Sequence, residues 1–555
     1  MSLKRRGENR TCLAGNNARP TVFFNNKNLA GLEIRAKTAN NGAMKILETA
    51  IALAACAHFC ATAEIKTPSI FSDGMMLQQN SANIWGTAEP GAKIEIEILG
   101  EKSSARAGEN GEWSARVKTP EGSPEPREVK IYENGKLAKT FSGVIFGDVW
   151  IAGGQSNMDF ALRGIDGAKA YIDSSAGSNV RYFAQGASSS RMFSARGIGK
   201  DPEREFPEGS RWVSPAPQNA GGLQGIPYIF AAELAKASGK PVGIVYTGTP
   251  GTKMAAWVSR QTYENSPLFK REREKFAERS KKYDYKKEKA KFDEDVRTYD
   301  ERVRKAKAEG KEPPPAWTVA PFLAPWPDSP DKWSTPSMLF NLRVNPLRGY
   351  AARGIIWYQG ESDSHDGFAD KFEGLIGEWR EVFGSPDMPF FFVQLPSYNS
   401  WKWELTRAEQ EKISKKLKNV SMVCAIDTGE EKDVHPRGKI EIGRRLAKAA
   451  LAGSGKIFPS LRSIDFRGGV AAVKFKYRKG LECRGKCRGF EMLSGGKWSA
   501  ADAEFDGKRV VLKSPDGSEI EGARYLWKPW AKPDACLFDA GGNPVPPFQS
   551  LKGEK

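Results

Sequence analysis

The stretch Gly147–Met158 (GDVWIAGGQSNM) joins a short apolar run to two glycines and a serine. The apolar run Val149–Gly153 is typical of a strand that is buried on both faces of a parallel sheet. The glycines permit a sharp turn directly after this strand, which leaves Ser156 at its carboxyl end. Because ligands bind at that edge of open α/β sheets, the stretch predicts a serine at a ligand-binding edge.

Four more apolar runs follow this strand, with candidate helices between them. The expected strands are Val242–Tyr246, Gly354–Tyr358, Phe390–Leu395 and Val420–Ile426, and the expected helices include Tyr228–Ala237, Phe368–Phe383 and Ile440–Leu451. Buried strands that alternate with helices predict a doubly wound α/β domain, which we assign to residues 147–455.

Regions of β texture flank this domain on both sides. In residues 64–146, Ala92–Ile98 alternates apolar and polar residues, and residues 456–555 show similar short segments separated by turn residues. Both regions are expected to form antiparallel β domains. The α/β domain also contains a charged insert at about 265–335, whose dense charges predict long solvated helices that serve as a lid or spacer or, alternatively, as a partner-binding arm.

The amino-terminal segment has the features of an export signal. After an upstream leader (1–43), residues 44–63 combine a short apolar run with the small-x-small pattern Ala61–Ala63. The alternatives are a lipoprotein box ending at Cys56 and a buried N-terminal helix. The signal therefore predicts an exported protein, either periplasmic or secreted, and no apolar run is long enough to span a membrane.

The net charge indicates which ligands to expect, and the cysteines indicate whether a disulfide or a zinc site is expected. The formal net charge is +18, but no nucleic-acid-binding motif accompanies it, so acidic glycans, or no charged partner at all, are better matches than nucleic acid. Cys483 and Cys487 are close enough in sequence to form a disulfide across a tight loop. A zinc site is not expected, because the chain has no CxxC pair and no histidine near these cysteines.

Histidines are so scarce that candidate bases are few. The chain has three, and His58 falls in the expected signal, which leaves His365 and His435. His435 follows the last expected strand, and Asp433 stands two residues before it, as a carboxylate that orients an imidazole requires. Asp427 is a second possible carboxylate, and a surface histidine beside Asp433 by chance is the alternative.

Ser156 can be interpreted as a nucleophile or as a plain helix N-cap. Gly251, after the second expected strand, and Gln359, after the third, offer hydrogen-bond donors for an oxyanion. Gln359 could instead be a structural amide that holds loops together, and Glu361 is expected to orient neighbouring loops.

Several separated blocks together resemble the bacterial sialate O-acetylesterases, a carbohydrate-esterase branch of the SGNH hydrolases. The blocks are FSDGMMLQ (Phe71–Gln78), GDVWIAGGQSNM (Gly147–Met158), PGTKMAAW (Pro250–Trp257), MLFNLRVNPL (Met338–Leu347), GIIWYQGESD (Gly354–Asp363), VHPRGKIEIGRRLA (Val434–Ala447) and FDAGGNPVPPFQS (Phe538–Ser550).

This resemblance implies a flavodoxin-like, three-layer αβα SGNH domain with accessory antiparallel β-sandwich domains. It also implies roles for the site residues, namely Ser156 as nucleophile, His435 as base, Asp433 as third triad member, Gly251 and Gln359 in the oxyanion hole together with the Ser156 amide, and Asn157 and Glu361 in support. Two departures, Pro250 where a glycine is usual and the long insert, leave the substrate preference open.

The expected reaction is hydrolysis of O-acetyl groups on sialic acid or related glycans through an acetyl-enzyme, with no metal or organic cofactor. The alternatives are a deacetylase of xylan or another polysaccharide, and a non-catalytic glycan-binding protein of the cell surface. The oligomeric state and the target of the insert stay open.

Overall fold

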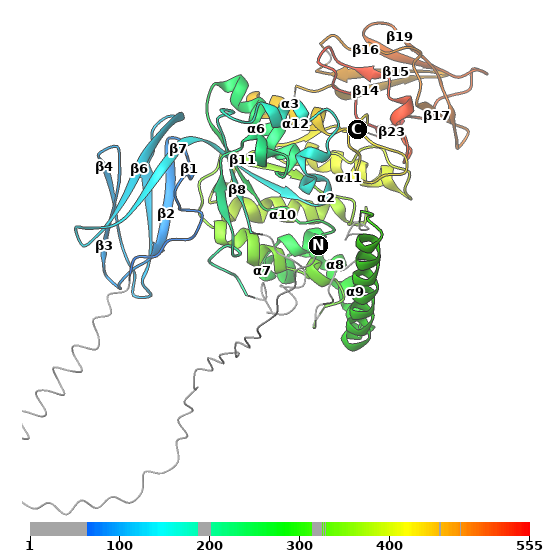
Figure 1. Cartoon of the computed structure of the whole chain (residues 1–555). Helices are drawn as coiled ribbons and strands as arrows, with labels where there is room; N and C mark the ends of the chain where they lie inside the picture. The colour runs from blue at the N-terminus through cyan, green and yellow to red at the C-terminus, as the bar shows by residue number, and fades with distance from the viewer. Residues whose placement is uncertain are drawn as a thin grey trace, which may run out of the picture. The chain divides into compact units, whose positions relative to one another are not determined.

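The strand that precedes Ser156 lies at the centre of the largest sheet (Figure 1). It is β7, a single strand over Lys136–Gly154, and the predicted run Val149–Gly153 is its carboxyl end. This computed structural model describes residues 64–186, 201–312, 325, 327, 329–453, 457–477 and 479–554. The expected leader and signal, with Cys56, lie outside the described residues.

Five parallel strands form the core of this sheet, in the order β10 (Val242–Tyr246), β7, β11 (Gly354–Tyr358), β12 (Phe390–Val393) and β13 (Val420–Val423). Counted along the chain from β7, the order is 2-1-3-4-5, which is that of flavodoxin-like folds. The fold prediction is therefore confirmed.

Two strands at the edge of this sheet are absent from the prediction. β8 (Val180–Ala184) pairs parallel with β10, and β9 (Arg211–Val213) pairs antiparallel with β8, which makes the sheet mixed. Both strands are short and include an arginine, so neither has the continuous apolar pattern of a central strand.

Helices cover both faces of the sheet because successive side chains of a buried strand point to opposite sides. On β11, Ile356 and Tyr358 pack in a cluster with α6 (Gly225–Ser238) and α12 (Ile440–Leu451). Ile355 and Trp357 pack in a second cluster with α10 (Phe368–Val382). The result is the predicted three-layer αβα arrangement (Figure 1).

The remaining helices are shorter or lie nearer the surface. They are α2 (Ser156–Asp159), α3 (Lys169–Asp173), α5 (Pro217–Ala220), α7 (Arg260–Asn265), α8 (Lys270–Lys281), α9 (Tyr285–Ala308) and α11 (Trp403–Lys416). The helices α8 and α9 confirm the helical prediction for the charged insert, and α9 buries none of its residues. In the described ranges, no helix is both long and apolar enough to cross a membrane.

The amino-terminal β region is continuous with the central sheet. Its strands are β1 (Met76–Gln78), β2 (Ser81–Thr87), β3 (Lys93–Ile98), β4 (Glu101–Arg106), β5 (Glu112–Lys118) and β6 (Ser123–Glu133). The first half of β7 pairs with β6, and its second half pairs with β10 and β11. One strand thus crosses the boundary predicted at residue 147, and the domain limits stay predictions.

The carboxyl-terminal β region forms antiparallel sheets of its own, as expected. Four strands make one sheet, β14 (Ser460–Arg467), β15 (Val470–Lys476), β20 (Arg509–Lys513) and β19 (Asp502–Phe505). Four make another, β18 (Lys497–Ala500), β17 (Phe490–Ser494), β21 (Gly522–Tyr525) and β23 (Phe548–Leu551), and β16 (Glu482–Cys483) pairs with β22 (Leu537–Phe538).

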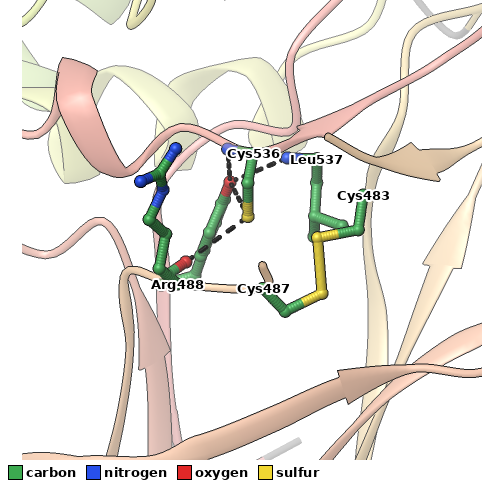
Figure 2. The surroundings of a disulfide bond; sticks show 6 residues. Cys483, Cys487, Arg488, Cys536 and Leu537 are labelled. Atoms are coloured by element: carbon green, nitrogen blue, oxygen red, sulfur yellow. Dashed lines mark hydrogen bonds between the residues drawn. A yellow bond between two sulfur atoms is a disulfide. The ribbon is translucent and has the colours of Figure 1, made fainter. Parts of the chain in front are cut away.

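A disulfide joins Cys483, at the end of β16, to Cys487, which answers the question that the sequence left open (Figure 2). Nearby, the buried thiol of Cys536 lies 3.5 Å from the carbonyl oxygen of Arg488. The Tyr525 hydroxyl accepts the backbone N–H groups of Cys536 and Leu537 at 3.0 and 3.2 Å. These contacts fix the loop that connects β21 to β22.

Candidate active site

Ser156 is the first residue of α2, directly beyond the carboxyl end of β7. Gly154 has φ of +131°, and a Cβ built there would lie 2.1 Å from the Tyr358 carbonyl oxygen, so only glycine fits this turn. The helix N-cap is Gln155, and it makes no side-chain capping bond. Ser156 is therefore not the N-cap, and its hydroxyl is available for another contact.

That contact is with His435. Ser156 Oγ lies 2.8 Å from His435 Nε2, although 279 residues separate the two in sequence. The serine follows β7, and the histidine lies in the segment between β13 and α12, so both belong to the carboxyl edge of the sheet. The structure thus brings together the serine and the histidine that the sequence singled out.

The two candidate carboxylates have different partners. Asp433 Oδ1 accepts the backbone N–H of His435 at 2.7 Å. In the described part of the chain, no hydrogen bond joins Asp433 to the imidazole itself. Both carboxylate oxygens of Asp427 accept from Arg445 at 2.7 Å, so Asp427 serves this largely buried ion pair and not the histidine.

A buried network under the Ser156–His435 pair holds the histidine loop. Asn157 Nδ2 donates to Glu361 Oε1 at 2.6 Å and to the Val434 carbonyl at 2.9 Å. Lys439, which is fully buried, donates to Asn157 Oδ1 at 2.5 Å. Since Oδ1 accepts from the ammonium group, the Asn157 amide must turn its N–H groups toward Glu361 and Val434, the residue before His435.

The protonation of this network follows from burial and charge. Burial lowers the pKa of His435, the charge of Lys439 lowers it further, and Asp433 opposes both. Burial lowers the pKa of Lys439 to about 7, against the charge of Glu361, and burial raises the pKa of the Glu361 carboxyl. A histidine with a lowered pKa is neutral at pH 7, as a general base must be.

The oxyanion candidates also lie at this edge. Gly251 has φ of +67° in the segment that follows β10, and among the described residues its N–H and that of Ser156 have no hydrogen-bond partner. Gln359 is buried, and its Nε2 donates to the Thr252 carbonyl at 2.7 Å. The contact recorded for Gln359 therefore supports the loop-holding interpretation, since it fixes the residue next to Gly251.

The other histidine has a different neighbour. The ring centroid of His365 lies 6.4 Å from that of Trp401, an indole that is 80% exposed. His365 makes no recorded hydrogen bond to a serine in the described ranges. His435 is thus the histidine placed for serine chemistry.

Comparison with known proteins agrees with this geometry. Residues 329–452 match the family model described as carbohydrate esterase, sialic acid-specific acetylesterase. The sialate O-acetylesterase of Rattus norvegicus is 25% identical over 537 residues, which cover 86% of this chain and 93% of that protein. The human sialate O-acetylesterase is 23% identical, with 86% and 91% covered. This chain is a carboxylic ester hydrolase related to the sialate O-acetylesterases.

A solved structure extends the likeness to the fold. The carbohydrate acetylesterase of Xanthomonas citri superposes with a TM-score of 0.69 at 24% identity, over 88% of this chain and 99% of that one. The shared architecture therefore includes the β regions as well as the α/β core.

Sequence reasoning missed the residues that support the site from beneath. Lys439 lies in the quoted block Val434–Ala447, but its sequence neighbours do not show that it is buried against Asn157. Asp363, within the quoted block Gly354–Asp363, accepts from the backbone N–H of Met254 at 3.0 Å and from Lys371 at 2.7 Å, and so fixes the segment after Gly251. Only its position in that block could have indicated it.

Proposed function

We propose that this chain is a serine esterase that removes O-acetyl groups from sialic acid or related glycans. The observation that carries the proposal is the 2.8 Å contact between Ser156 Oγ and His435 Nε2 at the switch point between β7 and β11. The relatives that bear the name sialate O-acetylesterase supply the substrate class.

The reaction is acyl transfer in two steps. Neutral His435 takes the proton of the Ser156 hydroxyl as the oxygen attacks the acetyl carbonyl, and the histidine then returns the proton to the departing sugar oxygen. Water, activated by the same imidazole, releases acetate from the acetyl-enzyme. The charge of Asp433 stabilises the imidazolium that forms between these steps.

The oxyanion forms beside donors that are already in place. The unpartnered N–H groups of Gly251 and Ser156 are the main donors, and each is worth about 3 kcal/mol of barrier. In this proposal Gln359 keeps one amide hydrogen on Thr252 and offers the other to the oxyanion. Asn157 and Glu361 hold the histidine loop and do not touch the substrate.

The decisive experiment replaces the nucleophile. Ser156→Ala should lower kcat/KM for nitrophenyl acetate by about 10⁴-fold or more, because the acetyl-enzyme cannot form. Ser174→Ala, which removes an exposed hydroxyl after α3, is the matched control and should keep full activity. A folded Ser156→Ala enzyme with normal activity excludes the proposal.

Acetate release from O-acetylated sialic acid, measured beside release from acetylated xylan, then separates the two substrate classes. A much larger kcat/KM for acetylated xylan than for O-acetylated sialic acid would identify the chain as a polysaccharide deacetylase.

We also propose that the protein is exported to the periplasm or secreted. The short apolar segment with its small-x-small end supports this, as does the disulfide between Cys483 and Cys487, because disulfides persist in oxidising compartments. The mass of the mature protein should correspond to a start at Glu64. A lipidated start at Cys56 would favour the lipoprotein alternative, and a full-length chain in the cytoplasm would contradict export.

A further inference from the structure

A cavity of about 680 Å³ opens beside the loop that carries His435. One wall is the segment 429–433, which ends in Asp433, and the other is the segment 530–533 of the carboxyl-terminal β region. Asp433 is two residues from His435, and two residues span at most about 7 Å of chain. The cavity thus borders the loop that carries His435.

The far wall is held rigidly against the α/β core. The fully buried guanidinium of Arg407 donates to the carbonyl oxygens of Pro529 at 3.2 Å, Pro396 at 3.4 Å, and Lys528. Lys532 Nζ donates to the Gly429 carbonyl at 2.8 Å, which joins the two walls directly. The cavity is therefore formed before any ligand arrives.

A second set of contacts fixes the same wall from the neighbouring loop. The Ala531 N–H donates to Ser397 Oγ at 3.2 Å, and the Tyr398 N–H donates to the Pro529 carbonyl at 3.3 Å. Ser397 and Tyr398 follow β12 at its carboxyl end. These bonds place the indole of Trp530, which is only partly buried, on the cavity surface.

The chemistry of the walls fits a sugar ring. Trp530 offers a flat aromatic face, and the C–H groups on one face of a pyranose pack against the negative face of such a ring. Glu430, Glu431 and Asp433 on the same cavity outnumber Lys432 and Lys532, so the lining is not a site built for an anion. A few polar groups around an aromatic platform are typical of small-molecule sites.

We propose that this cavity binds the sugar ring that carries the acetyl ester, with Trp530 as its stacking platform. The inference rests on the proposed function and adds to it: the carboxyl-terminal β region supplies a specificity residue, and the recognised feature is the pyranose face rather than a carboxylate. Acetylated neutral sugars should therefore bind as well as O-acetylated sialic acid.

The test compares an ester that has a sugar with one that has none. In the full-length enzyme, Trp530→Ala should raise KM for O-acetylated sialic acid and for acetylated xylan oligosaccharides by about tenfold, since stacking of this kind is worth about 1 kcal/mol or more. The kcat/KM for nitrophenyl acetate should not change. Trp530→Phe, which keeps an aromatic face, should restore most of the affinity for the sugars.

Trp498→Ala is the matched control, because Trp498 lies on β18 of the same region and does not line the cavity. Its KM values should equal those of the parent enzyme. A Trp530→Ala enzyme with unchanged KM for both sugars, or with equal losses on the sugar esters and nitrophenyl acetate, overturns the proposal.

A binding measurement separates this proposal from the proposed function. Calorimetric titration of Ser156→Ala with O-acetylated sialic acid needs no turnover, and the added Trp530→Ala change should raise the Kd about tenfold. Binding that depends on Trp530 in an enzyme without esterase activity would reject the proposed function and keep the cavity assignment. Binding that is equally tight with and without Trp530 would reject the cavity assignment and leave the proposed function in place.

Discussion

The two β regions that flank the α/β core have similar sequence texture but meet the core at opposite ends of its strands. The amino-terminal region enters through the first half of β7, ahead of the residues that pair with β10 and β11. The carboxyl-terminal region contacts Ser397 and Gly429, which follow β12 and β13. Because ligands of such sheets bind at the carboxyl ends, only the second region can touch a substrate.

The difference teaches that an accessory domain's role depends on the end of the sheet to which it is attached. Shared strand β7 makes the amino-terminal region part of the scaffold that positions Ser156. Hydrogen bonds from Arg407 of the core to carbonyl groups of the carboxyl-terminal region hold that region in place as a wall of the site. Changes in the first should affect stability, and changes in the second should also affect recognition.

The largest effect is expected from a substitution that leaves an empty space in the core of the amino-terminal region. Phe146 is fully buried on β7, where it pairs with Leu77 of β1 and Ser123 of β6. Phe146→Ala should lower the free energy of unfolding by about 3–5 kcal/mol, measured by urea denaturation. At temperatures where the variant is folded, KM for acetylated sugars should equal that of the parent.

Phe146→Leu is the milder companion variant and should lose less stability. If Phe146→Ala raises KM for the sugars in the folded enzyme, the amino-terminal region is not a pure scaffold and the contrast between the regions fails.

How far the sequence alone predicts this fold depends on how strands are buried. The strands Val242–Tyr246 and Gly354–Tyr358 and the helix Ile440–Leu451 match the structure residue for residue, because burial on both faces or on one clear stripe leaves an unambiguous pattern. β7 is longer than predicted because its first residues, Lys136 to Thr140, are mostly exposed and lack a continuous apolar pattern. β9 has three residues, too few for any periodicity.

The sequence predicts the site residues that belong to scarce or distinctive residue patterns. It does not predict the residues whose role depends on being buried by the fold. Scarcity of histidine identifies His435, and a strand followed by glycines identifies Ser156. Lys439 and Arg407 are two of many cations in the sequence, and their importance comes from tertiary contacts that remove them from water. The role of Trp530 likewise cannot be inferred from its sequence neighbours, because it depends on the position of Trp530 in the cavity wall.

An intermediate effect is expected from the clamp between the carboxyl-terminal region and the core. Arg407→Met removes the donor from three carbonyl groups and should cost about 1–3 kcal/mol of stability. Because these bonds hold the wall that bears Trp530, KM for acetylated sugars should rise severalfold, while hydrolysis of nitrophenyl acetate continues. Steady-state kinetics with both esters and urea denaturation check the two parts.

The chain contains a matched clamp at the other end of the same strands. Arg380 donates to the carbonyls of Met388 at 3.0 Å and Lys418 at 2.8 Å, just before β12 and β13. Arg380→Met should cost comparable stability without a change in KM for sugars. Equal KM effects from both variants would mean that loss of stability, and not loss of the wall, weakens recognition.

The smallest effect is expected from Lys439→Met, which removes a buried charge and a hydrogen bond but keeps the volume. His435 faces Ser156, Lys439 and Asp433, and the Lys439 charge lowers the pKa of the imidazole. Activity requires neutral His435 and falls as pH drops through that pKa. Removing the charge raises the pKa, so the acidic limb of kcat/KM should move to higher pH. The pH-independent rate should fall only about twofold, because Asn157 loses the donor that orients it.

Burial lowers the pKa of Lys439 to about 7, so this lysine is mostly charged at acidic pH, where the shift of the limb should be visible. Lys448→Met changes a partly exposed lysine of α12, the helix whose N-cap is Lys439, and should leave the pH profile unaltered. A purely structural lysine would lower the rate at every pH and leave the limb in place. Such a result would remove Lys439 from the electrostatics of the site, although it would still leave the hydrogen bond to Asn157 as the support of the histidine loop.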